Sequence, residues 1–286
     1  MTEAVRPPWR QPYNLYRLFK YSVYSLLAVN VFLFFLEDYR ASAAIFSDGV
    51  SWRNVVEAYS ATIDTAAWVI LLLLFELETA VIDDEKLEGS LRWVLFGIRA
   101  VCYFFIVYAC YGYWVKWATV SQVLPFAIDD ACSLIGSDFT WVEDLDEYIP
   151  IDAASCQQLN KEPLLQIAET QIIGTTTALT EAIRLAVVDI VNAMDWILVV
   201  LVLEIEVFLQ PRGRLTDGMV SASKYLKVLM YSVLLACAIY WGIKGDFLDF
   251  WDAFMWLVAF VFIELNIFEW HGETGKGGGG VEPQPA

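Results

Sequence analysis

The sequence predicts an all-α membrane protein, a polytopic transmembrane helical bundle of six spans built from three parallel two-helix repeats. Three observations lead to this class. First, 58% of the 286 residues are hydrophobic and the mean hydropathy is +0.52, although the formal net charge is −17. Second, the apolar residues form runs that a water-soluble core of this size could not hide. Third, three of these runs share one motif. So negative a charge makes nucleic acid a poor partner and a lipid bilayer the expected surroundings.

Six stretches are apolar and long enough, or nearly long enough, to cross a hydrocarbon layer of roughly 30 Å as helices. The expected spans are residues 17–36, 58–78, 93–114, 186–209, 225–243 and 250–269. The first has no small-residue cleavage site before Leu36, so we expect a retained span and not a signal peptide. The transmembrane domain thus covers residues 16–270. It follows a cytoplasmic or interfacial segment, residues 1–15, and precedes a disordered Gly- and Pro-rich tail, residues 271–286.

The distribution of Lys and Arg sets the expected orientation. With the N-terminus in the cytoplasm, the inner segments hold twelve of these residues and the outer segments hold the other six of the eighteen. This asymmetry follows the positive-inside rule. We therefore expect a multi-pass protein of the plasma (inner) membrane with both termini in the cytoplasm.

The longest connection, residues 117–180, is expected on the outer side as an acidic insert. Between Thr119 and Asn160 it has no Lys or Arg and carries Asp129, Asp130, Asp138, Glu143, Asp144, Asp146, Glu147 and Asp152. These acids suit a solvated lid that docks a protein partner. A calcium site around Asp144–Glu147 is the weaker alternative, because the spacing of an EF-hand loop is missing.

The cysteines divide between the insert and the spans. Cys132 and Cys156 lie in the insert, so we expect a disulfide between them in an oxidising compartment. The other three, Cys102, Cys110 and Cys237, lie in expected spans, where cysteine usually acts as a small apolar filler. No strands are expected. From Glu162 onwards the apolar residues follow a helical period, which predicts a helix running straight into the fourth span.

The second, fourth and sixth expected spans repeat one motif. Aligned on a tryptophan, each copy has Asp or Asn four residues before it, Glu eight residues after it, and Glu or Asn ten residues after it. The copies are Asp64, Trp68, Glu76 and Glu78; Asn192, Trp196, Glu204 and Glu206; and Asp252, Trp256, Glu264 and Asn266. They belong to two-helix units at residues 16–82, 91–210 and 224–270. Each unit crosses twice, so all share one orientation about a pseudo-threefold axis along the membrane normal.

Helix geometry separates the polar residues of each copy into two faces. At about 100° per residue, the first polar residue, the tryptophan and the last polar residue lie on one stripe with an apolar middle. The Glu between them lies about 160° round from the last residue, so the two Glu layers cannot both face one axis. We hypothesise that one face of each repeated helix converges on the axis. This gives an inner carboxylate ring and, where the stripe faces inward, an outer ring of Asp64, Asn192 and Asp252.

These polar residues point to transport. An ionisable residue within a span costs roughly 2.5 to 3.5 kcal/mol on insertion scales, so it is a functional candidate by default. Carboxylate rings select cations, which predicts a cation channel or a cation-coupled transporter for a small cation. The alternative is a non-catalytic scaffold, sensor or accessory subunit that docks partners through the acidic insert. Gene duplication alone can preserve Trp and Glu at span boundaries as topology markers, and Trp68, Trp196 and Trp256 are then packing residues.

Enzymatic chemistry is not expected, and no cofactor is expected. The only histidine, His271, lies in the tail, so a bis-histidine haem, a zinc protease centre and a Ser–His pair each lack a needed residue within the spans. No Lys lies in the middle of an expected span, which excludes a retinal-type Schiff base.

Overall fold

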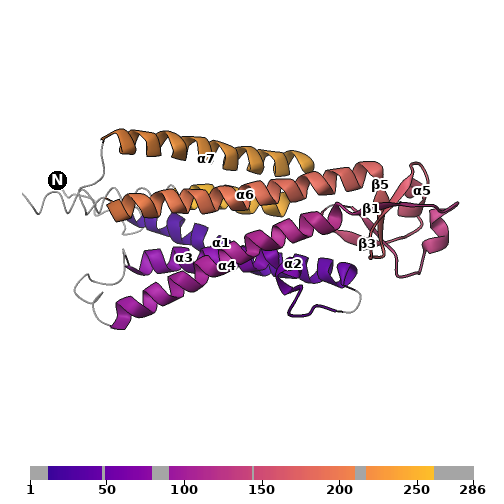
Figure 1. Cartoon of the computed structure of the whole chain (residues 1–286), viewed down its shortest axis with the longest axis horizontal. Coiled ribbons are helices and arrows are strands. Elements are labelled where there is room, and N and C mark those ends of the chain that lie inside the picture. Colours follow the sequence, from indigo (N-terminus) through magenta and orange to yellow (C-terminus); the bar gives the residue numbers. More distant parts are fainter. Residues whose placement is uncertain (1–11, 47–48, 79–89, 144, 210–216, 261–286) are drawn as a thin grey trace, which may run out of the picture.

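The computed structural model describes residues 12–46, 49–78, 90–143, 145–209 and 217–260. Its helices form a bundle in which the long members lie side by side, with a small sheet at one end (Figure 1). The helices of the bundle are α1 (Pro12–Ile45), α2 (Val55–Ala58), α3 (Ser60–Glu76), α4 (Ser90–Val120), α6 (Thr176–Leu209), α7 (Asp217–Lys244) and a further helix at residues 247–260. The end that carries the sheet is called the sheet end below, and the other the opposite end.

Four of these helices are long and apolar enough to cross a membrane. The candidate spans are Leu15–Ile45, Ser90–Val120, Thr176–Glu206 and Gly218–Lys244. Helix α3 and the described part of the 247–260 helix are shorter than 18 residues. They are therefore not among these four candidate spans. The helices also extend past the expected spans, since α1 ends at Ile45 and α6 begins at Thr176. A helix can continue into water beyond the end of its apolar run, because its backbone hydrogen bonds do not depend on apolar side chains. Hydropathy therefore does not show where the helix ends.

The outward faces of these helices suit contact with lipid. Large apolar side chains are exposed along them, such as Phe32 on α1, Phe104 on α4 and Leu229 on α7. The hydroxyls of Ser25 on α1 and Ser232 on α7 donate hydrogen bonds to backbone carbonyls four residues earlier, which satisfies these polar groups within their own helix. A soluble protein rarely exposes apolar surface on this scale, so the pattern agrees with a bilayer as the solvent.

The expectation of no strands is wrong. Five short strands between α4 and α6 form one sheet in the order β1-β4-β5-β2-β3. They are β1 (Val123–Phe126), β2 (Thr140–Val142), β3 (Tyr148–Pro150), β4 (Leu164–Ile167) and β5 (Ile172–Thr175). All neighbouring strands are antiparallel except β2 and β5, which are parallel.

The helix expected from Glu162 onwards is replaced by the β4–β5 hairpin, and α6 begins only at Thr176. The turn between the strands places Glu169 at φ 62°, in the left-handed region. The periodicity of a short apolar run fits a helix or a strand equally well. Here the run forms strands, because its β-branched and apolar residues pair in the β4–β5 hairpin.

The predicted disulfide between Cys132 and Cys156 is confirmed. It joins a 3₁₀ turn, η4 (Ala131–Leu134), to the short helix α5 (Ser155–Leu159). A small core of the insert packs around it, which includes the fully buried Leu159 and Ile173. The three remaining cysteines are free and buried.

The sheet is not a separate domain, because one apolar cluster joins it to the bundle. Val142 and Leu145 of the insert pack with Leu179 and Ala182 of α6 and with Trp241 of α7. The insert therefore covers the sheet end of the helices, and it carries charged residues into their interior.

Candidate functional site

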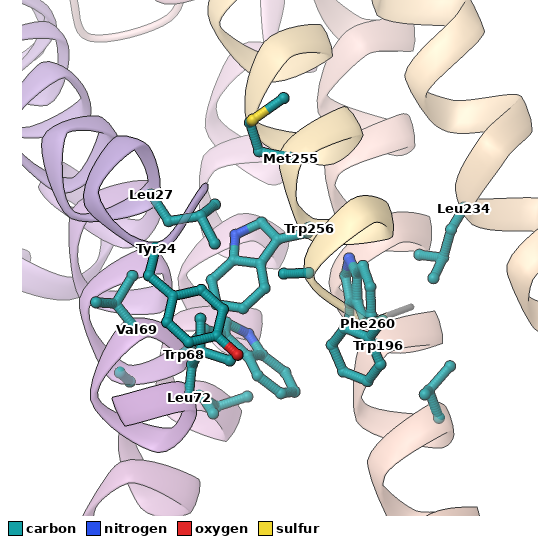
Figure 2. Close-up of a cluster of buried hydrophobic side chains, with 14 of the residues drawn as sticks. Tyr24, Leu27, Trp68, Val69, Leu72, Trp196, Leu234, Met255, Trp256 and Phe260 are labelled. Carbon is teal, nitrogen blue, oxygen red and sulfur yellow. The ribbon is translucent and has the colours of Figure 1, made fainter. Parts of the chain in front are cut away.

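The three tryptophans of the repeated motif meet in the middle of the bundle. Trp68 comes from α3, Trp196 from α6 and Trp256 from the 247–260 helix, and Figure 2 shows them entering the same space. Their ring centroids lie 6.1 Å (Trp68–Trp196), 6.3 Å (Trp68–Trp256) and 6.4 Å (Trp196–Trp256) apart. All three are buried, and Phe260 packs against Trp196 at 4.6 Å. With Val199 and Ala259, both fully buried, they form an apolar layer across the bundle, called the tryptophan layer below.

On the sheet side of this layer the first polar residues of the motif also come together. Asp64, Asn192 and Asp252 line a cavity of about 30 Å³, together with Thr65 and the three tryptophans. Trp68 Nε1 donates a hydrogen bond to Asp64 Oδ1 at 3.0 Å. Asn30 of α1 donates its amide to Asp252 Oδ1 at 2.7 Å, while Asn192 Oδ1 has no partner among the described residues. The first polar residue and the tryptophan of each motif copy therefore lie on the inward face of these three helices.

This space widens toward the sheet end into a cavity of about 40 Å³, which is room for about three water molecules. Most residues that line the narrower part also line the wider one. Its walls carry six carboxylates against one ammonium group: Glu37, Asp64, Asp146, Asp189, Asp249 and Asp252, with Lys116. We refer to it as the acidic cavity.

The single ammonium group of the acidic cavity is shared with the insert. Lys116 of α4 is buried, and its Nζ lies 2.7 Å from Asp146 Oδ2. Asp146 belongs to the connection between β2 and β3, beside the buried Leu145. The insert thus supplies one of the carboxylates of the acidic cavity. Asp146 Oδ1 and Asp189 Oδ1 are buried and have no hydrogen-bond partner among the described residues.

The described Glu residues of the motif lie beyond the tryptophan layer and do not line either part of the cavity. Each described one has a partner on a neighbouring helix. Glu76 pairs with Lys20 at 2.7 Å and accepts from Tyr21, Glu78 pairs with Arg99, Glu204 accepts from Tyr103, and Glu206 pairs with Lys227 and accepts from Ser223. Glu264 and Asn266 lie outside the described residues. Carboxylates near helix C-termini oppose the macrodipole, and bonding to a basic side chain offsets that cost.

Two of these ion pairs have the same spacing in the sequence. Glu78 pairs with Arg99 and Glu206 pairs with Lys227, and both pairs are 21 residues apart in the chain. In each case a Glu at the same motif position bonds to the next long helix along the chain, α4 or α7.

Asp146 of the acidic cavity was considered only as part of the weaker calcium alternative. Four further residues of the cavity were not singled out from the sequence as site residues: Glu37, Lys116, Asp189 and Asp249. A signal was present for two of them. Asp189 and Asp249 lie three residues before Asn192 and Asp252, hence on the same helix face, and Ala61 stands at that place before Asp64. For Lys116 the only signal was a basic residue just beyond an expected span.

No metal centre is evident in the described part of the chain, where no three His, Cys, Asp or Glu residues are placed to hold an ion. The calcium site considered around Asp144–Glu147 includes Asp144, which lies outside the described residues. Four membrane-length apolar helices agree with the class of multi-pass membrane proteins. No family model, no curated protein and no solved structure matches the chain.

Proposed function

We propose that this protein is a cation-coupled membrane transporter whose cation occupies the acidic cavity. The observation that carries the proposal is the convergence of Asp64, Asn192 and Asp252, from three helices, on a cavity inside the bundle. Six carboxylates and one ammonium group leave a surplus of negative charge in a medium of low dielectric. Such a surplus is costly unless cations or protons offset it, and ionisable groups within membrane bundles commonly mark transport routes.

A transporter fits better than an open channel because the cavity is closed on one side. The tryptophan layer, with Phe260, Val199 and Ala259, fills the bundle beyond Asp64 and its counterparts. A cation held above this layer reaches the other side only after the layer opens. Access to a fixed site from alternate sides is the general behaviour of secondary transporters.

The proposed topology has six spans in three parallel hairpins with both termini in the cytoplasm. The corresponding positions of Asp64, Asn192 and Asp252 around one cavity support a threefold repeat, as does the shared spacing of the Glu78–Arg99 and Glu206–Lys227 pairs. In this topology the insert is external and the acidic cavity faces outward. Glu78 and Glu206 then join one hairpin to the next near the cytoplasmic side, and Glu76 joins the two helices of the first hairpin. None of them takes part in binding the cation.

Cation flux into proteoliposomes tests the proposal, with uptake of protons, Na⁺, K⁺ and Ca²⁺ measured separately. In the double variant Asp64→Asn and Asp252→Asn, each amide can keep the oxygen that accepts from Trp68 or Asn30 but loses its charge. We expect flux to fall at least about tenfold. Asp195→Asn is the matched control, because Asp195 is as buried as Asp189 but does not line the cavity. Undiminished flux in the double variant would exclude the proposed site.

The second candidate is a membrane scaffold or sensor that docks a partner protein through the insert. The apolar packing of the tryptophan layer favours it, because a passive component needs no passage through its centre. Absence of flux for every cation tested, together with crosslinking that always recovers one fixed partner at the insert, would decide for this class.

A further inference from the structure

Asp189 is the most buried acid of the acidic cavity. Only 8% of its surface is exposed, whereas Glu37, Asp64, Asp146, Asp249 and Asp252 are all more accessible. Its Oδ1 atom has no hydrogen-bond partner among the described residues. The titratable and charged groups that share the cavity with it or act on it electrostatically are Glu37 of α1, Asp64 of α3, Tyr113 and Lys116 of α4, Asp146 of the insert, Cys237 of α7, and Asp246, Asp249 and Asp252 at the 247–260 helix.

The nearest basic side chain, Lys116, does not form an ion pair with Asp189. Lys116 Nζ bonds to Asp146 Oδ2 at 2.7 Å, so its closest carboxylate belongs to the insert. An ionised Asp189 therefore lies among other acids with a bare acceptor oxygen. Desolvating a charge and leaving an acceptor unpaired both cost free energy. A proton bound to Asp189 removes the charge and turns the bare oxygen into a hydroxyl donor for a neighbouring acceptor.

The size and shape of the acidic cavity favour the same ligand. Its volume of about 40 Å³ holds about three waters, fewer than the hydration shell that ions such as Mg²⁺ retain. A bare metal ion needs several oxygens that converge on one point, and in the described chain no three acids do so. A few waters between spaced carboxyl groups instead form a hydrogen-bonded route, which is sufficient for a proton.

We propose that the transported cation is the proton and that the Asp189 carboxylate is its binding site, an assignment that rests on the proposed function. The proton reaches the cavity from the sheet side on a hydronium ion. One O–H bond of that ion breaks and leaves a water molecule, and a new O–H bond forms at Oδ1 of Asp189. The Lys116–Asp146 ion pair remains beside it as a fixed neighbour. Asp146 comes from the insert, so the position of the insert sets how much of the positive charge of Lys116 is neutralised by Asp146. The net charge of the cavity, and with it the affinity of Asp189 for the proton, depends on this ion pair.

The first test measures proton uptake into liposomes of neutral lipid that enclose a pH-sensitive dye. With a pH gradient imposed across the membrane, we expect the native protein to acidify the interior. We expect Asp189→Asn to do so at least about tenfold more slowly. The matched control is Asp195→Asn, on the same helix and equally buried but away from the cavity. Thermal denaturation of both variants establishes that they are folded.

The second test is infrared spectroscopy of the native protein in deuterated buffer as a function of pH. We expect a band from a protonated carboxylic acid that titrates and that is missing from Asp189→Asn. If that variant does not fold, absence of a titrating band in the native protein overturns the assignment.

The remaining outcomes separate this inference from the proposed function. Proton uptake by Asp189→Asn at the native rate overturns the assignment of Asp189. Uptake of Na⁺ or K⁺ that is sensitive to Asp64 and Asp252, with no acidification of the interior, overturns the proton but leaves the proposed function intact. Absence of flux for every cation tested removes both.

Discussion

The buried acids on the two sides of the tryptophan layer are handled in different ways. On the sheet side, the carboxylates of the acidic cavity face one another across a small space and share one ammonium group. On the opposite side, Glu76, Glu78 and Glu206 each bond to a Lys or Arg of their own. The motif looks uniform in the sequence, yet its first polar residue lines the cavity, whereas its described Glu residues bond to side chains of neighbouring helices. The difference teaches that an acid within a span is informative only together with its partners.

The two arrangements should respond oppositely to mutation. The ion pairs on the opposite side link α1 to α3, α4 to α3 and α7 to α6, so they contribute to the packing of the bundle. Removing one partner leaves a charge uncompensated, which costs most where that charge is buried, as at Glu76. In the acidic cavity, removing a carboxylate relieves repulsion between like charges. Mutations of the ion pairs on the opposite side should therefore lower stability, whereas mutations in the acidic cavity should lower transport.

The largest expected effect is that of Lys20→Met. The side chains of Lys20 and Glu76 are 6% and 7% exposed, so the variant leaves Glu76 buried without its base. We expect the free energy of unfolding in detergent to fall by about 3 to 5 kcal/mol. The double variant Lys20→Met, Glu76→Gln should regain most of this loss. Asp64→Asn, the matched change in the acidic cavity, should stay within about 1 kcal/mol of the native protein. Equal losses for Lys20→Met and Asp64→Asn would abolish the distinction between the two sides.

The next effect concerns the insert, which belongs only to the sheet side. Replacing Cys132 and Cys156 with Ser opens a covalent link between residues 24 positions apart. We expect a loss of about 2 to 4 kcal/mol, concentrated in the insert. Hydrogen exchange resolved by segment should show faster exchange in the five strands and unchanged exchange in α3 near Glu76. Faster exchange throughout the bundle would show that the two sides are not independent.

A smaller loss is expected for Lys227→Met. The side chains of Lys227 and Glu206 are 21% and 24% exposed, so water screens the charge left on Glu206 better than it screens Glu76. We expect a loss of about 1 kcal/mol, read from the same denaturation experiment. A loss as large as that of Lys20→Met would mean that exposure does not set the strength of these pairs.

Part of this site can be predicted from the sequence because helix geometry is fixed. The spacing of Asp64 and Trp68, repeated at Asn192 and Asp252, places these residues on one face of each helix, and that face lines the cavity between the helices. The disulfide is also predictable, because only Cys132 and Cys156 lie outside the apolar spans.

The rest depends on contacts between distant parts of the chain. Lys116 and Asp146 are 30 residues apart, and a sheet that the helical period did not reveal brings them together. The partners of Glu76 and Glu78 likewise depend on which helices become neighbours. Periodicity identifies a face of a helix but not the element that packs on it.

The smallest effect is an acid limit on the stability of the insert. Asp152 Oδ1 accepts from the backbone of Ser155 at 2.7 Å, from its hydroxyl at 2.9 Å and from the backbone of Ala154 at 2.9 Å. These bonds lower the pKa of Asp152 below its ordinary value of 3.8. Bonds from the Asn160 amide and the Cys132 backbone lower the pKa of Asp130 in the same way. Both carboxylates are anchors of the short turns that the disulfide joins.

Lowered pKa values fix the sign of the pH dependence. The folded insert binds these protons less readily than the unfolded chain, so the stabilisation is complete above pH 3.8 and is lost as the pH falls through the lower, folded pKa values. We expect amide exchange in the insert to depend on pH only through its intrinsic chemistry down to about pH 4, and extra exchange to appear below it. Asp152→Asn should weaken this acid response, whereas Asp138→Asn, an exposed acid of the same insert, should keep it. Extra exchange that sets in well above pH 4 would contradict this account, because both carboxylates remain ionised there.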